Sequence, residues 1–131
     1  MSIDDVINEI KRINRMSEIK PEDYAEVGGW AEVVVKDVGD RLKPTQLRKI
    51  FHHLKHLQRE FQKSAFHRAK VATMIPLLAY AKGRGHIPDK FHKLLLLCFS
   101  PEKCNSVEDF RSAVSFMEAI MAFHKFYNPK Q

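Results

Sequence analysis

Apolar residues at the start of the chain recur every three or four positions. They are Ile3, Val6, Ile7, Ile10 and Ile13. This spacing predicts an amphipathic helix with one buried side, and Ser2 followed by Asp5 matches a capping box at its start. No run alternates apolar and polar residues one by one, as a half-buried strand does. The pattern therefore predicts an all-α fold.

Proline, glycine and serine residues divide the rest of the sequence into five further segments with helical spacing. The first of these segments begins at Pro21, and the second begins near Pro44 and includes residues 47–63. The third spans 66–82 and the fourth spans 88–97. The fifth follows Ser106, which is its expected N-cap. Proline suits the first turn of a helix, and serine is a preferred N-cap. A chain of 131 residues is long enough to bury its own core. We therefore expect a compact bundle of about five to six helices in a single domain, residues 1–131.

Glycine and proline also fall inside two of the predicted helices. Gly28 and Gly29 interrupt the second at a cost of about 1 kcal/mol each relative to alanine, and either a kink or a close helix contact would explain them. Pro76 ends or kinks the segment 66–82. The buried stripe expected for the second helix is Tyr24, Val27, Ala31, Val34, Val35, Val38 and Leu42. The stripe expected for the last helix, which has Asp109 at its capping-box position, is Phe110, Val114, Met117, Ile120 and Met121.

Charge is distributed unevenly along the chain, whose formal net charge is +6. Residues 1–40 hold five Lys or Arg and ten Asp or Glu, a net charge of −5. Residues 41–93 hold thirteen Lys or Arg and two acids, a net charge of +11, and six of the seven histidines. Residues 94–131 balance at four against four. This concentration favours a surface for a polyanion over a merely solvated face.

The segment 47–63 separates apolar and basic residues onto two sides of one helix. One side carries Leu47, Ile50, Phe51, Leu54, Leu57 and Phe61. The other carries Arg48, His52, Lys55, Arg59 and Lys63, with Lys49 and His56 beside them. The apolar side is expected to dock on the bundle, and the basic side repels itself, because like charges four residues apart are unfavourable. A bound polyanion would relieve that repulsion.

The expected mode of nucleic-acid binding is contact with phosphates. The chain has no helix-turn-helix spacing, and the aromatic sheet platform of a common RNA-binding domain is absent from the pattern. About four phosphate contacts on a single strand predict a log–log salt slope near −3, at about −0.7 per contact. Lys82 and Arg84 lie beside two glycines, where backbone can approach a ligand closely, and we expect a second contact point there.

The sequence offers little support for catalysis or for a cofactor. His52 and His56 have the spacing by which two histidines on a helix share zinc, but no glutamate stands between them and only Glu60 is near. We predict no metal site, no cofactor and no enzyme activity, and a histidine-metal helical enzyme stays as the outside alternative. Cys98 and Cys104 are expected to be reduced thiols. With no membrane-length apolar run and no export signal, we expect a cytoplasmic protein.

Three sequence motifs carry a family resemblance. Residues 43–51, KPTQLRKIF, resemble the TQLRK-plus-aromatic signature of the small subunit of type III-A CRISPR effector complexes. Residues 78–84, LAYAKGR, are similar to that family's LAYA-x-GR segment, and residues 116–125, FMEAIMAFHK, to its C-terminal block. The motifs occur in the family's order, and the likeness covers about residues 24–127. The small subunit of type III-B complexes shares the architecture and remains an alternative.

The resemblance implies a non-catalytic, RNA-binding role in antiviral defence. Its partners would be guide RNA, single-stranded target RNA, other subunits of the effector complex and further copies of the small subunit along a filament. By the motif match, Arg48, Lys49 and Arg84 would contact RNA. The other candidates are predicted because they lie on the basic side of the segment 47–63 or, for Lys82, beside the two glycines. The predicted RNA-binding set is Arg48, Lys49, His52, Lys55, Arg59, Lys63, Lys82 and Arg84. A generic single-strand-binding helical domain is the other alternative.

Overall fold

The computed structural model describes residues 1–129, and all regular structure in that range is helical. The α-helices are α1 (Ile3–Arg12), α2 (Pro21–Tyr24), α3 (Trp30–Val38), α4 (Pro44–Lys63), α5 (Arg68–Ala72), α6 (Met74–Gly83), α7 (Asp89–Cys98) and α8 (Val107–Tyr127). Two 3₁₀ turns, η1 (Met16–Glu18) and η2 (Gly39–Arg41), join some of them. The all-α prediction is confirmed. The expected number of helices, five to six, is too low, because seven α-helices in the described range have five residues or more.

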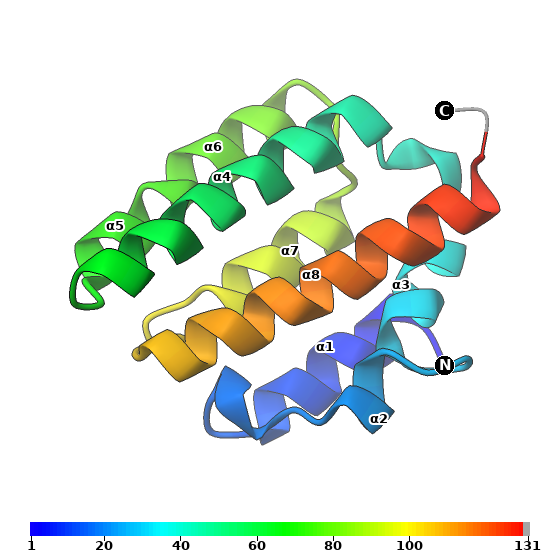
Figure 1. Ribbon diagram of the computed structural model, residues 1–131. Helices are drawn as coiled ribbons and strands as arrows, with labels where there is room; N and C mark the ends of the chain where they lie inside the picture. Colours follow the sequence, from blue (N-terminus) through cyan, green and yellow to red (C-terminus); the bar gives the residue numbers. More distant parts are fainter. Residues whose placement is uncertain (130–131) are drawn as a thin grey trace.

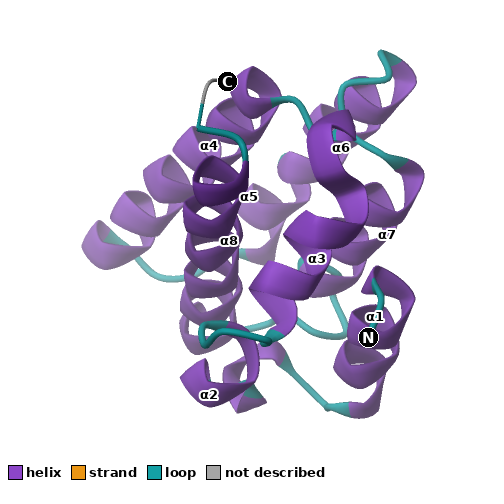
Figure 2. Ribbon diagram, turned by 90° about the vertical axis from the view of Figure 1, so that its right-hand side faces the viewer, coloured by secondary structure: helices purple, strands orange, loops and turns teal. Residues whose placement is uncertain are grey.

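The helices form three groups that share one core. In Figure 1, α4, α5 and α6 lie together on one side, α1, α2 and α3 lie on the other, and α7 and α8 run between them. The long helix α8 packs against α3, α4 and η1, and α7 packs against α1 and α6. Figure 2 shows the same helices joined by loops alone. The buried residues of all three groups form one hydrophobic cluster, which fixes α4 relative to α6 and α8.

The ends of α1 follow from local chemistry. The predicted capping box is confirmed, since Ser2 N–H donates to the Asp5 carboxylate at 2.7 Å and the Ser2 hydroxyl accepts from Asp5 N–H at 3.3 Å. At the other end, Lys103 is buried, and its ammonium group donates to the carbonyls of Lys11 and Ile13. A cation at a helix C-terminus satisfies carbonyls that the helix leaves unpaired. The first helix is thus capped at both ends.

The second predicted helix is interrupted at its two glycines. Gly28 has φ of +81°, a left-handed conformation that glycine adopts easily, and its N–H donates to the Glu32 carboxylate at 2.9 Å. Helix α3 then starts afresh after Gly29. Val27, which we expected in the buried stripe, is 87% exposed. That prediction is wrong because the chain leaves the helical path before Val27 can turn inward.

The predicted helix over 66–82 is two helices, with the break at Thr73. The Thr73 hydroxyl donates to the Lys70 carbonyl at 2.6 Å and closes the end of α5. Pro76, where we expected an end or a kink, instead lies in the first turn of α6. Proline is tolerated there because the first amides of a helix have no partner within it.

Helices α7 and α8 lie close to their predicted positions. Ser106 caps α8, and its hydroxyl accepts from Asp109 N–H at 3.1 Å. The expected stripe of α8 is buried except for Met121, which is half-buried. Cys98 and Cys104 are buried free thiols. Burial raises the pKa of both, that of Cys104 to about 12, so neither is disposed to act as a nucleophile.

Candidate nucleic-acid interface

Helix α4 presents the predicted separation of apolar and basic sides. It begins at Pro44 and runs for 20 residues. Its buried apolar residues are Leu47, Ile50, Leu54, Leu57 and Phe61, and Phe51 is half-buried. The opposite side is the basic face, which we define as Arg48, Lys49, His52, Lys55, Arg59 and Lys63. All of these are exposed except Lys55, which is half-buried.

Most cations of the basic face have no acidic partner within residues 1–129. Glu60 is the one acid on α4, and its carboxylate lies 3.6 Å from both His56 and Lys70. Within residues 1–129, the side chains of Arg48, Lys49, Arg59 and Lys63 form no ion pair. Lys55 differs, because its ammonium donates to Gln58 Oε1 at 2.9 Å and lies 6.0 Å from the centre of the Phe51 ring. The positive charge of the face is therefore largely uncompensated.

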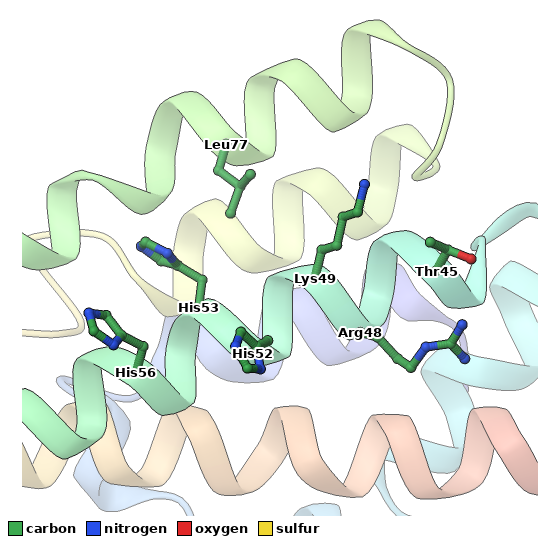
Figure 3. A pocket seen from close by; sticks show the side chains of 7 residues that line it. All are labelled: Thr45, Arg48, Lys49, His52, His53, His56 and Leu77. Carbon is green, nitrogen blue, oxygen red and sulfur yellow. The ribbon is translucent and has the colours of Figure 1, made fainter.

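A groove lies between α4 and α6 on one side of the basic face. Its volume is about 540 Å³, and its lining residues are Thr45, Arg48, Lys49, His52, His53, His56 and Leu77. Figure 3 shows Lys49 and His53 reaching from α4 towards α6, and Leu77 reaching from α6 towards α4. We call this the α4–α6 groove. It combines cations, imidazole rings and one apolar side chain.

A second groove lies between α4 and α8. It has a volume of about 340 Å³ and is lined by Arg48, Phe51, His52, Lys55, Arg59 and Met121. Arg48 and His52 line both grooves. The basic face is therefore a ridge with a hollow on each side. A phosphate chain following the ridge would meet cations whichever side it took.

The structure places the other predicted residues at the two ends of this ridge. Lys63 is the last residue of α4. Arg84 follows α6, where its guanidinium lies 5.8 Å from the centre of the Tyr80 ring and donates to the Tyr80 hydroxyl at 3.3 Å. The loop after Arg84 is tied to the start of α4, since Lys43 N–H donates to the His86 carbonyl at 3.2 Å. The structure thus brings Arg84 to the N-terminal end of the ridge.

Lys82 differs from the other predicted contacts. Its ammonium lies 3.9 Å from the carboxylate of Asp89 at the start of α7, so its charge is partly compensated. It is also only half-exposed. Among the seven lysines and arginines of the predicted set, Lys82 is therefore the one whose charge is paired with an acid within residues 1–129.

The clustered histidines lie among the cations of the basic face. Across residues 1–129, no group of three His, Cys, Asp or Glu side chains could hold a metal ion. His52, His53 and His56 instead share their groove with Arg48 and Lys49, whose charges oppose a bound cation. In the same part of the chain, no helix is both long and apolar enough to cross a membrane.

Sequence reasoning missed several residues that line the two grooves. Thr45, His53 and Leu77 were not among the predicted site residues. Met121 was expected to be core. The spacing of apolar residues along one helix does not predict where a groove forms between that helix and another. A usable signal was the segment LAYAKGR, because a helix that buries Leu78 and Ala81 must pack against other helices, and α4 is one of its neighbours.

Comparison with known proteins identifies a family. The family model described as Csm2 Type III-A matches residues 21–130, which include all three motifs and the whole of α4. No curated protein and no solved structure matches the chain. The family match covers far more than half of the 131 residues. The chain therefore belongs to the Csm2 family, the small subunits of type III-A CRISPR effector complexes.

Proposed function

We propose that this small subunit holds the phosphates of RNA on the basic face of α4. The observation that carries the proposal is the row of exposed cations that have no acidic partner in residues 1–129. At about 1.5 Å per residue, the 20 residues of α4 span roughly 30 Å, enough to follow several consecutive phosphates. Arginine forms bidentate phosphate contacts, and lysine contributes a point charge.

The RNA in question is the guide strand, the single-stranded target, or the two where they pair. Phosphate contact is independent of base sequence, which suits a subunit that must accept any target. Arg84 extends the contact surface at the N-terminal end of α4, and Lys63 extends it at the other end. In this role the protein is a non-catalytic RNA-binding subunit acting in antiviral defence in the cytoplasm.

Membership of the Csm2 family implies assembly with other Csm subunits. We propose in addition that the chain, acting as one helical domain, contacts further copies of itself along the complex. Residues 1–40 carry a net charge of −5 and residues 41–93 a net charge of +11. Helices α1 to α3 lie on the side of the molecule away from α4 to α6 (Figure 1). Such opposite charges on opposite sides favour head-to-tail contact between copies.

The direct test is a triple variant, Arg48→Gln, Lys49→Gln and Arg59→Gln, titrated with fluorescent single-stranded RNA at low salt. We expect its affinity to be about tenfold to 100-fold weaker than that of the wild-type protein. The physical reason is the loss of three exposed charge pairs worth up to about 1 kcal/mol each. Fluorescence anisotropy at one fixed salt concentration measures the effect.

The matched control removes the same charge from the acidic end of the chain, as Lys11→Gln, Arg15→Gln and Lys20→Gln. All three side chains are exposed and lie outside α4 to α6. If RNA binding depends on charges of the basic face, the affinity of the control variant for RNA stays within about twofold of the wild-type affinity. Equal losses in the two triple variants would contradict the proposal, because net charge alone would then explain the binding.

A further inference from the structure

The α4–α6 groove differs in chemistry from the rest of the ridge. A surface for phosphates alone needs only cations, yet this groove also holds three imidazole rings and the side chain of Leu77. Its volume of about 540 Å³ lies in the range of roughly 300–1,000 Å³ that is typical of small-molecule pockets. The groove is therefore large enough for a flat aromatic ligand, and phosphate contact leaves its apolar part unexplained.

We infer that the α4–α6 groove accepts one unstacked base of a single RNA strand, with the adjoining phosphates on Arg48 and Lys49. The inference rests on the proposed RNA-binding role and specifies the form of its ligand. The base would lie between the ring of His53 on α4 and the side chain of Leu77 on α6. Histidine is among the side chains on which splayed-out bases stack in proteins that recognise single-stranded RNA.

The ring of His53 is held in place across the groove. Its Nε2 lies 3.4 Å from Thr73 Oγ1, at the junction of α5 and α6. The Thr73 hydroxyl donates its own hydrogen to the Lys70 carbonyl at 2.6 Å, so its oxygen can only accept from the histidine. In a neutral ring, Nε2 then carries the hydrogen, and Nδ1 is left as a hydrogen-bond acceptor. The groove wall therefore combines a fixed ring face with an acceptor suited to the exocyclic amine of a base.

Leu77 gives the groove an apolar wall. Leu77 is half-buried and packs against the hydrophobic cluster, and Figure 3 shows its side chain directed into the gap between the two helices. A phosphate placed against Leu77 would lose hydration without gaining a partner, whereas the face of a base would lose little. The bases of an intact duplex are stacked and cannot enter sideways. The arrangement therefore favours a single-stranded segment.

The test compares two ligands that carry equal numbers of phosphates. One is an oligoadenylate of about eight nucleotides, within the site sizes known for single-strand-binding folds, and the other is an abasic ribose-phosphate oligomer of the same length. Titration of the full chain at about pH 8, where a histidine in solution is uncharged, measures both affinities. We expect the wild-type protein to bind the oligoadenylate about five- to tenfold more tightly, a low-end value for stacking of one base.

His53→Ala is expected to abolish this preference while leaving the affinity for the abasic oligomer unchanged. Leu77→Ser, which removes the opposite wall, should do the same. His67→Ala is the matched control, because His67 is an exposed histidine outside the groove, and it should keep the full preference. Thermal unfolding followed by circular dichroism establishes that each variant is folded before its affinities are compared.

The outcomes separate this inference from the proposed function. Equal affinity of the wild-type protein for the two oligomers, or a preference that survives both groove variants, would overturn the inference and leave the phosphate role standing. Absence of binding to either oligomer would instead overturn the phosphate role, and the inference with it.

Discussion

Replacing Phe110 with alanine is expected to lower the free energy of unfolding by about 3–5 kcal/mol. The Phe110 side chain is fully buried on α8. Its ring centre lies 5.2 Å from that of Phe61 in a perpendicular arrangement and 6.0 Å from that of Phe99. Truncation would leave a cavity where α8 meets the C-terminal turn of α4, and the surrounding rings could close it only in part. One of the contacts that anchor the basic helix would be lost.

Urea unfolding followed by far-ultraviolet circular dichroism measures this loss of stability. Phe126→Ala is the matched control, because Phe126 lies on the same helix but is 72% exposed. Its replacement should change the free energy of unfolding by less than about 0.5 kcal/mol. A loss below about 1 kcal/mol for Phe110→Ala would mean that the aromatic cluster does not hold α4 and α8 together.

Replacing Asp109 with asparagine is expected to lower the free energy of unfolding by about 2–4 kcal/mol at pH 7. Asp109 is fully buried, and its carboxylate accepts hydrogen bonds from Ser17 N–H and Asn105 N–H, each at 3.0 Å. The bond from Ser17 joins η1 to the start of α8, where the helix dipole also favours a negative charge. Asparagine offers a single acceptor oxygen and would leave one of the two amides unpaired.

The effect of this substitution should depend on pH. Burial by itself raises the pKa of Asp109, but the hydrogen bonds from Asn105 and Ser17 outweigh it and hold the pKa below its ordinary value. A carboxyl group with a lowered pKa stabilises the fold above its unfolded-state pKa, about 3.9, and that stabilisation is lost as pH falls through the folded-state value. The difference in the free energy of unfolding between the wild-type protein and Asp109→Asn, the stability gap, should therefore become smaller below about pH 4.

Urea unfolding at pH 7 and at successively lower pH measures this gap. Glu108→Gln is the matched control, because Glu108 is an exposed acid in the same first turn of α8. Its replacement should cost less than about 1 kcal/mol at either pH. A gap for Asp109→Asn that stays constant down to pH 3 would show that the hydrogen-bonded charge is not the source of the stability.

Local signals in the sequence predicted much of the fold. The capping box of α1, the proline that opens α4 and the serine that caps α8 lie where backbone groups need partners that only certain residues supply. The buried stripe of α4 was likewise predictable, because a 20-residue helix with one apolar side has a single way to dock. These features depend on neighbours within one or two turns.

Other features could not be predicted in the same way, and they include two local helix breaks and one groove formed by distant segments. The spacing of Val27 continues the helical period of its neighbours, but α2 ends at Tyr24, and Val27 lies in the turn that leads to Gly28. The break at Thr73 depends on a hydroxyl that competes with the backbone for one carbonyl. The α4–α6 groove needs Leu77 opposite His53, residues that are 24 positions apart. The sequence indicated the cations of the site and missed its second wall.

The salt dependence of RNA binding shows whether the basic face of α4 contacts RNA phosphates in this type III-A small subunit. For about four contacts, the logarithm of the binding constant should fall with the logarithm of salt concentration with a slope near −3 for the wild-type protein. Loss of three contacts in the variant lacking the charges of Arg48, Lys49 and Arg59 should reduce the slope to about −1. Parallel lines for the two proteins would contradict such contact.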